Sequence, residues 1–322
     1  MTYPVGYTIL RTEDPVRRRP LILDIWYPSE ASAEEIPHNY GLGTGMVAEN
    51  APAVKSPCPV IIMSHGAFGS ARNYSWIAEH MTRHGFLVMG VSHFKESPVY
   101  GPETIDPASA LQPWHRPQDC SFAIGFLLGE SKFRAMADPS RIGALGHSSG
   151  GATVIAMGGA IFDPDAMAQY CRARQDQQDK GCSYASGIPQ VSVTDPDARK
   201  SWRDSRIRAI LAMDPALGPG YDATALSAIS VPVHIIGAEK NDFLPFEPHA
   251  GHYAACIPGA TLTRLSRGEG HFIFIDLCQA DIQVNTVPLC SDRPGVRRAE
   301  VHERLREIIQ GFFEKYLTSA KT

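Results

Sequence analysis

The sequence lacks the features that would place it in a membrane or export class. No run of about eighteen apolar residues occurs in the chain, so a transmembrane helix is not expected. The N-terminus begins MTYPVGYTIL and shows no charged segment followed by a long apolar stretch, so no signal peptide is visible. These absences predict a cytoplasmic protein, or a periplasmic or secreted one if an export signal has been trimmed.

An excess of basic charge is also missing. The chain carries 34 acidic and 30 basic side chains, which gives a formal net charge of −4. A protein that binds nucleic acid normally presents a basic stripe to the phosphates. The densest basic cluster, Arg17-Arg18-Arg19, lies between two strand-like segments and is interpreted as a solvated turn. We therefore expect a small-molecule substrate and no nucleic acid, while the oligomeric state stays open.

Cysteine is present, but in no metal-binding pattern. The seven cysteines match no zinc-ligand spacing, so we expect neither a metal nor a cofactor. Two close pairs, Cys171 with Cys182 and Cys278 with Cys290, lie in polar stretches where disulfides could hold long insertions. Disulfides would require an oxidising compartment, whereas the missing signal favours a reducing one. The sequence leaves the state of both pairs open.

Short β-branched segments alternate with longer amphipathic stretches along the chain. This alternation is typical of βα units that build a mostly parallel sheet. Several segments are almost entirely apolar, as strands buried on both faces are. The first two have no helical stretch between them, which predicts an antiparallel hairpin at the edge of the sheet, joined to the parallel strands. The eight expected strands are 5–10, 20–27, 59–64, 85–91, 141–146, 207–213, 231–236 and 261–265.

Helical periodicity and long connections complete the expected organisation, a single catalytic domain over residues 1–322. Three connections are longer than ordinary loops and indicate functional insertions, namely 30–57, 93–117 and 161–205. The polar segment 161–205 is either a lid or rim over a pocket or a solvated excursion. The expected helices are 72–84, 118–129, 149–160 and 297–317.

The motif Gly146-His147-Ser148-Ser149-Gly150-Gly151 follows an expected strand and precedes an expected helix. This is the context of a nucleophile elbow, the strained turn that exposes a serine hydroxyl above the sheet of an α/β-hydrolase fold. Glycines two positions before and after the serine leave room where a Cβ would clash. The motif therefore predicts Ser148 as a nucleophile, and the alternative is a glycine-rich turn with an ordinary serine.

A serine nucleophile needs two N–H donors aimed at the oxyanion of its tetrahedral intermediate. One usually comes from the residue after the nucleophile and the other from the loop after the third strand. These positions are Ser149 and, in the segment Ser64-His65-Gly66-Ala67, the amide of Ala67. His65 is then expected to be structural, with a hydrogen bond to the backbone beneath this loop.

His271 is the expected general base among twelve histidines. It follows the last expected strand in Gly270-His271-Phe272, as the chain order serine, acid, histidine requires. The alternative is a histidine in a surface loop. His93, Trp114 and His115 lie in an insertion and could line the substrate site, or could be exposed or packed.

Two loops offer the acid that would hold the imidazole in its productive tautomer. Asp214 follows the sixth expected strand, and Asp242 follows the seventh. A turn or helix-capping aspartate is the alternative for each, and this alternative must hold for at least one of them. The residues alone leave both candidates open.

The chain resembles the platelet-activating-factor acetylhydrolase family and bacterial esterases described as similar to dienelactone hydrolase. The resemblance implies a Ser-His-Asp triad, an oxyanion hole at Ala67 and Ser149, and hydrolysis of carboxylic esters. Its motifs are Trp26-Tyr27-Pro28, Ser64-His65-Gly66, His84-Gly85-Phe86, Arg116-Pro117-Gln118-Asp119, Gly146-His147-Ser148-Ser149-Gly150-Gly151 and Gly270-His271-Phe272-Ile273-Phe274.

The resemblance also favours Asp214 as the acid. In the acetylhydrolase family, and in the similar chlorophyllase, the acid follows the sixth strand. Many other α/β-hydrolases place it after the seventh strand, four residues before a proline, and here Asn241 occupies that position. True dienelactone hydrolases use a cysteine nucleophile, so the serine at position 148 argues against a dienelactone substrate.

The expected function is cofactor-independent hydrolysis of carboxylic esters through an acyl-enzyme intermediate. An amidase, a thioesterase or an acyltransferase would use the same residues, and the sequence does not separate these activities. A binding protein with an inactive hydrolase fold is the alternative outside the enzymes, and it predicts a damaged triad or oxyanion loop.

Overall fold

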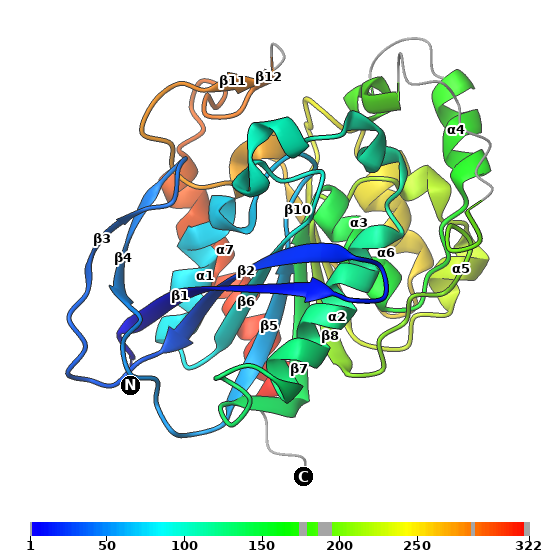
Figure 1. Ribbon diagram of the computed structural model, residues 1–322. Helices are drawn as coiled ribbons and strands as arrows, with labels where there is room; N and C mark the ends of the chain where they lie inside the picture. Colours follow the sequence, from blue (N-terminus) through cyan, green and yellow to red (C-terminus); the bar gives the residue numbers. More distant parts are fainter. Residues whose placement is uncertain (1, 174–178, 186–194, 285–286, 319–322) are drawn as a thin grey trace.

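The computed structural model describes residues 2–173, 179–185, 195–284 and 287–318, and its centre is a ten-stranded sheet with helices on both faces (Figure 1). One buried apolar cluster includes side chains of α2 and α3, and a second, on the other face, includes side chains of α1 and α7. The seven helices among these residues are α1 (Ser75–Arg83), α2 (His115–Gly129), α3 (Ser149–Met157), α4 (Pro164–Ala173), α5 (Ala223–Ser227), α6 (His252–Cys256) and α7 (Arg298–Leu317).

The strand order in the sheet is β10-β9-β8-β7-β5-β6-β2-β1-β4-β3. Neighbouring strands from β10 to β6 are parallel, so their carboxyl ends share one edge, where α/β folds place their functional loops. The strands are β1 (Val5–Asp14), β2 (Arg19–Pro28), β3 (Ile36–Asn39), β4 (Thr44–Glu49), β5 (Cys58–Ser64), β6 (Leu87–Ser92), β7 (Ala137–His147), β8 (Ile207–Met213), β9 (Val233–Ala238) and β10 (Thr261–Leu265), with β11 (Gln283–Val284) and β12 (Val287–Pro288) forming a separate hairpin.

The expected α/β-hydrolase sheet is confirmed, with two more strands than the eight expected. The hairpin of β1 and β2 is antiparallel and joins β6, as its sequence predicted, but it does not form the edge of the sheet because β4 pairs with β1. The additional strands, β3 and β4, come from the insertion 30–57 and extend the sheet beyond β1. Three side chains of β3 are exposed, so this strand has no apolar alternation that would have revealed it.

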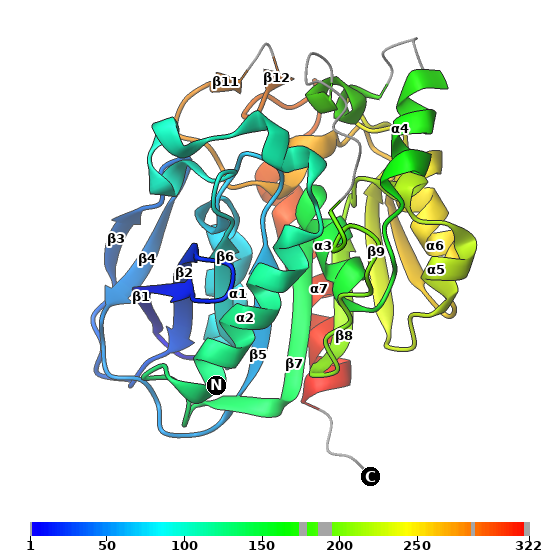
Figure 2. The ribbon, with the colours of Figure 1, turned by 45° about the vertical axis from the view of Figure 1, so that its right-hand side comes forward.

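The insertion 161–205 contributes α4 and a short helical turn, Lys180–Ala185, and the predicted lid lies partly outside the described residues. Figure 2 places α4 and the β11–β12 hairpin at the same end of the molecule. Among the described residues, no helix combines the length and apolar character needed to cross a membrane.

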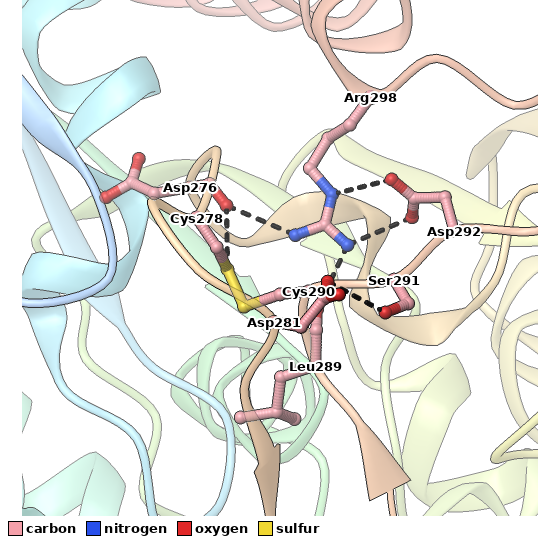
Figure 3. The surroundings of a disulfide bond; sticks show 8 residues. All are labelled: Asp276, Cys278, Asp281, Leu289, Cys290, Ser291, Asp292 and Arg298. Carbon is pink, nitrogen blue, oxygen red and sulfur yellow. Dashed lines mark hydrogen bonds and ion pairs between the residues drawn. A yellow bond between two sulfur atoms is a disulfide. The ribbon is translucent and has the colours of Figure 1, made fainter.

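Both candidate cysteine pairs are disulfides. Cys171–Cys182 joins α4 to the turn Lys180–Ala185, while Cys278–Cys290 closes the loop that carries β11 and β12. The second bond lies beside the buried guanidinium of Arg298 at the start of α7 (Figure 3). That guanidinium donates to the carbonyl oxygens of Asp276 (3.1 Å) and Leu289 (3.0 Å) and forms an ion pair with Asp292. An ion pair and a disulfide therefore both hold this loop in place.

Candidate active site

Ser148 occupies the turn between β7 and α3 with a backbone conformation of φ 57° and ψ −121°, which few residues other than glycine adopt. The flanking glycines are required by close packing. A Cβ on Gly146 would lie 2.1 Å from the carbonyl oxygen of Gly150, and one on Gly150 would lie 2.0 Å from that of Ser64. The Ser148 amide donates to the carbonyl of Met213 (3.0 Å), which fixes the turn against β8. The strained turn is thus held by its surroundings.

A line of hydrogen bonds connects Ser148, His271 and Asp214. The Ser148 hydroxyl lies 2.9 Å from His271 Nε2, and His271 Nδ1 lies 2.5 Å from Asp214 Oδ2. His271 is 1% exposed and Ser148 is 7% exposed, so both side chains are largely shielded from bulk water. A carboxylate at Nδ1 leaves Nε2 free to accept the serine proton, which is the geometry that activates a serine nucleophile.

The structure places the two candidate acids differently around His271. Asp214 contacts the imidazole and also accepts hydrogen bonds from the Ala238 amide (3.1 Å) and from Asn241 Nδ2. Asp242 is exposed, and its Oδ1 accepts only from the backbone amide of His271 among the described residues, at 2.9 Å. The Asn241 that departs from the common seventh-strand pattern therefore serves as a donor to Asp214.

The loop after β5 approaches the elbow closely. A Cβ on Gly66 would lie 3.4 Å from Ser148 Cβ, and the Gly66 amide donates to the Tyr74 hydroxyl (3.0 Å). Within the part of the chain that the structure describes, the amides of Ala67 and Ser149 donate to no protein acceptor. Two unused N–H groups beside a serine hydroxyl are what an oxyanion hole requires.

His147 and Tyr74 connect the three loops of the site, a link that the sequence did not predict. His147 Nε2 donates to the carbonyl of His271 (3.0 Å), so its Nδ1 accepts from the Tyr74 hydroxyl (2.8 Å). Burial and the neighbouring His271 lower the pKa of His147 well below its usual value, which keeps the ring neutral and this pattern intact. One chain of hydrogen bonds thus connects the loop after β5, here called the glycine loop, with the elbow and with the loop that carries His271.

His65 is buried beneath the glycine loop, as expected for a structural residue. Its Nδ1 donates to the carbonyl of Gly66 (2.6 Å), and its Nε2 accepts from the amide of His93 (3.0 Å). Its own carbonyl accepts from Arg116, which forms a buried ion pair with Glu96. Burial and the charge of Arg116 hold the pKa of His65 well below its usual value. These contacts hold the carbonyl groups of His65 and Gly66 in place, just before Ala67.

His93 belongs to a second Ser-His-Asp array, which is fully buried beside His65. Its Nε2 lies 2.8 Å from Ser64 Oγ, and its Nδ1 lies 2.9 Å from Asp119 Oδ2. Trp114 is also buried, and its ring nitrogen donates to Asp195 (2.8 Å), whereas His115 lines a cavity of about 400 Å³ beside Arg17, Arg18 and Arg19. The basic cluster Arg17-Arg18-Arg19 therefore lines a cavity.

Apolar side chains cover one side of the His271 ring. The ring of Phe243 stacks on His271 with centroids 5.0 Å apart and an interplanar angle of 11°, while Phe272 packs edge-on against both rings. Ala216 and Leu244 complete this cluster, which excludes water from one face of the imidazole. No group of three or more potential metal ligands occurs in the described part of the chain.

The chain is similar to known esterases in sequence and in fold. A family profile for chlorophyllase matches residues 44–166. Cutinase est1 of Thermobifida alba is 24% identical over 223 residues, which cover 69% of this chain and 54% of the cutinase. The chain thus spans about half the length of this curated relative.

A solved structure of a ferulic acid esterase from Streptomyces cinnamoneus superposes on nearly the whole chain. The TM-score is 0.66, the sequence identity is 20%, and the match covers 99% of this chain and 91% of the esterase. At this identity the match establishes the architecture, which is the α/β-hydrolase fold.

Proposed function

We propose that this α/β-hydrolase fold is a serine hydrolase that cleaves carboxylic esters. The observation that carries the proposal is the hydrogen-bonded line from Ser148 through His271 to Asp214, which begins at a strained strand-to-helix turn. Similarity to a cutinase and to a ferulic acid esterase supports ester hydrolysis in preference to the amidase, thioesterase and acyltransferase alternatives.

In the proposed mechanism, Ser148 attacks the ester carbonyl while His271 Nε2 takes the hydroxyl proton. Asp214 accepts a hydrogen bond from Nδ1–H and stabilises the imidazolium. The unused amides of Ala67 and Ser149 donate to the oxyanion. His271 then protonates the leaving alcohol, and water, activated by the same imidazole, releases the acid from the acyl-enzyme.

We further propose that residues 1–322 form one catalytic domain with a lid or rim insertion at 161–205. The two disulfides also favour an oxidising compartment for folding. Titration of thiols in denaturant tests this state. Three thiols are expected without reductant, from Cys58, Cys120 and Cys256, and seven after reduction. Seven thiols before reduction would contradict the disulfides.

The decisive experiment combines turnover with covalent labelling. The full chain is assayed with p-nitrophenyl acetate and butyrate, with matched anilides and thioesters, and then treated with a fluorophosphonate. We expect turnover of the esters above the other substrates, and a phosphonylated peptide that contains Ser148. A folded protein that cleaves no ester and leaves Ser148 unlabelled would establish the inactive binding protein instead.

A further inference from the structure

Outside the site, the strongest unassigned feature is a buried pair formed by Asp179 and His249. Asp179 is 3% exposed and His249 is 2% exposed. His249 Nε2 lies 2.7 Å from Asp179 Oδ2, and His249 Nδ1 accepts from the Gly218 amide at 3.2 Å. Because Nδ1 is an acceptor, the proton lies on Nε2 and points at the carboxylate. The pair is therefore a directed, water-shielded contact.

This pair joins the insertion to two loops near Asp214. One follows β8 and contains Gly218, and the other follows β9 and contains His249. Gly218 belongs to the loop that follows Asp214, and a Cβ there would lie 2.1 Å from the carbonyl oxygen of Pro248. Asp179 belongs to the insertion 161–205. Its other oxygen, Oδ1, accepts a hydrogen bond from the Gly181 amide (2.9 Å), next to Cys182 of the first disulfide. Burying a carboxylate costs free energy unless it is paired, so the buried Asp179 requires its hydrogen bond with His249.

The next residue of the insertion reaches the catalytic histidine through one aromatic ring. The Lys180 amide donates to the carbonyl of Phe243 (2.9 Å), and the Phe243 ring stacks on His271. The other end of this short segment is fixed as well, because the Phe243 amide donates to Asn241 Oδ1 (2.8 Å) while Asn241 Nδ2 donates to Asp214. Phe243 is therefore held between the acid loop and the insertion.

We propose that Asp179 is a positioning residue, which uses its bond to His249 to hold Lys180 and Phe243 so that the ring fixes the plane of the His271 imidazole. This inference rests on the proposed function. A contact of this kind acts on the orientation of the base and thus on the transition state, because a small misplacement of a catalytic group is costly. Asp179 itself touches no reacting atom.

The test compares kcat, KM and the rate of fluorophosphonate labelling for the wild type, Asp179→Ala and Asp179→Asn. We expect Asp179→Ala to lower kcat and the labelling rate by about tenfold with KM within about twofold. Asp179→Asn keeps an oxygen that accepts from His249 Nε2 and is expected to restore most of the rate. Asp195→Ala is the matched control, because Asp195 belongs to the same insertion but accepts from Trp114.

A double-mutant cycle with Phe243→Leu identifies the route of the effect. If Asp179 acts through Phe243, the double variant is no slower than Phe243→Leu alone, whereas independent effects multiply. Multiplying effects, or an Asp179→Ala variant that labels and turns over like the wild type, would overturn the proposal. The comparison uses folded protein, verified by circular dichroism. A wild type without turnover or labelling would instead remove the proposed function.

Discussion

The described residues include two Ser-His-Asp arrays with the same hydrogen-bond pattern, an outer one at Ser148 (7% exposed) and an inner one at Ser64 (1% exposed). In the outer array, Ser148 lies 2.9 Å from the imidazole of His271. In the inner array, Ser64 lies 2.8 Å from the imidazole of His93. Each imidazole contacts an aspartate through Nδ1. Interatomic distances therefore do not distinguish a proposed catalytic triad from a structural one.

The difference lies in the backbone and in the neighbouring charges. Ser64 ends the regular strand β5 and is 1% exposed, whereas Ser148 lies at a strained turn beside unused amides. The acid of the inner array, Asp119, also forms ion pairs with Arg17 and Arg19. Burial alone would raise the pKa of Asp119, but the bond from His93 and the charge of Arg19 hold it well below its usual range. The strained turn and the unused amides, not the hydrogen-bond distances, therefore distinguish the proposed catalytic array from the inner one.

The largest expected contrast comes from removing each serine hydroxyl. Ser148→Ala is expected to lower kcat by about 10⁴-fold to 10⁶-fold, because the nucleophile is lost. Ser64→Ala is expected to leave kcat/KM within about threefold and to lower the free energy of unfolding by about 1–3 kcal/mol, because His93 Nε2 loses its partner. Ester kinetics and urea unfolding measure both effects. Equal losses of activity would remove the distinction between the arrays.

The aspartates provide the next contrast. Asp214→Asn is expected to lower kcat by about 10⁴-fold, since an amide can hold the imidazole in the wrong tautomer. Asp119→Asn is expected to cost about 3–5 kcal/mol of stability instead, because it removes the buried carboxylate that pairs with Arg17 and Arg19. Kinetics on folded protein and chemical unfolding separate the two outcomes.

Asp242→Asn is the control for the alternative acid. Its side chain accepts from the His271 amide and is exposed, so we expect a loss of activity below about tenfold. A loss as large as that of Asp214→Asn would return Asp242 to the triad.

Local sequence signals predicted the outer part of this picture. Alternating apolar segments predicted the parallel strands, and the glycine-flanked serine predicted the elbow that the structure shows at Ser148. The pattern after β9 was harder to interpret, because Asn241 replaces the common acid. Only the folded loops show that Asn241 and Asp214 contact each other.

The inner array could not be predicted, because its members come from three elements that only the sheet order brings together. Ser64 ends β5, His93 follows β6 and Asp119 lies in α2, and each also fits an ordinary loop, strand or helix position. His147 and Tyr74 were missed for the same reason, since 73 residues separate the two partners. Contacts between distant segments leave no periodicity in the sequence.

The smallest expected effect concerns how the inner array responds to pH. Burial and the charge of Arg116 lower the pKa of His93 to about 4, so the folded protein keeps this imidazole neutral while the unfolded chain becomes protonated below about pH 6.5. Its contribution to stability is therefore complete above pH 6.5 and is lost as the pH falls toward 4. Measured by urea unfolding, the stability advantage of wild type over His93→Gln should shrink by on the order of 3 kcal/mol across this range. A pH-independent difference would mean that the pKa of His93 is the same in the folded and unfolded protein, and it would contradict a buried, neutral imidazole in the inner array.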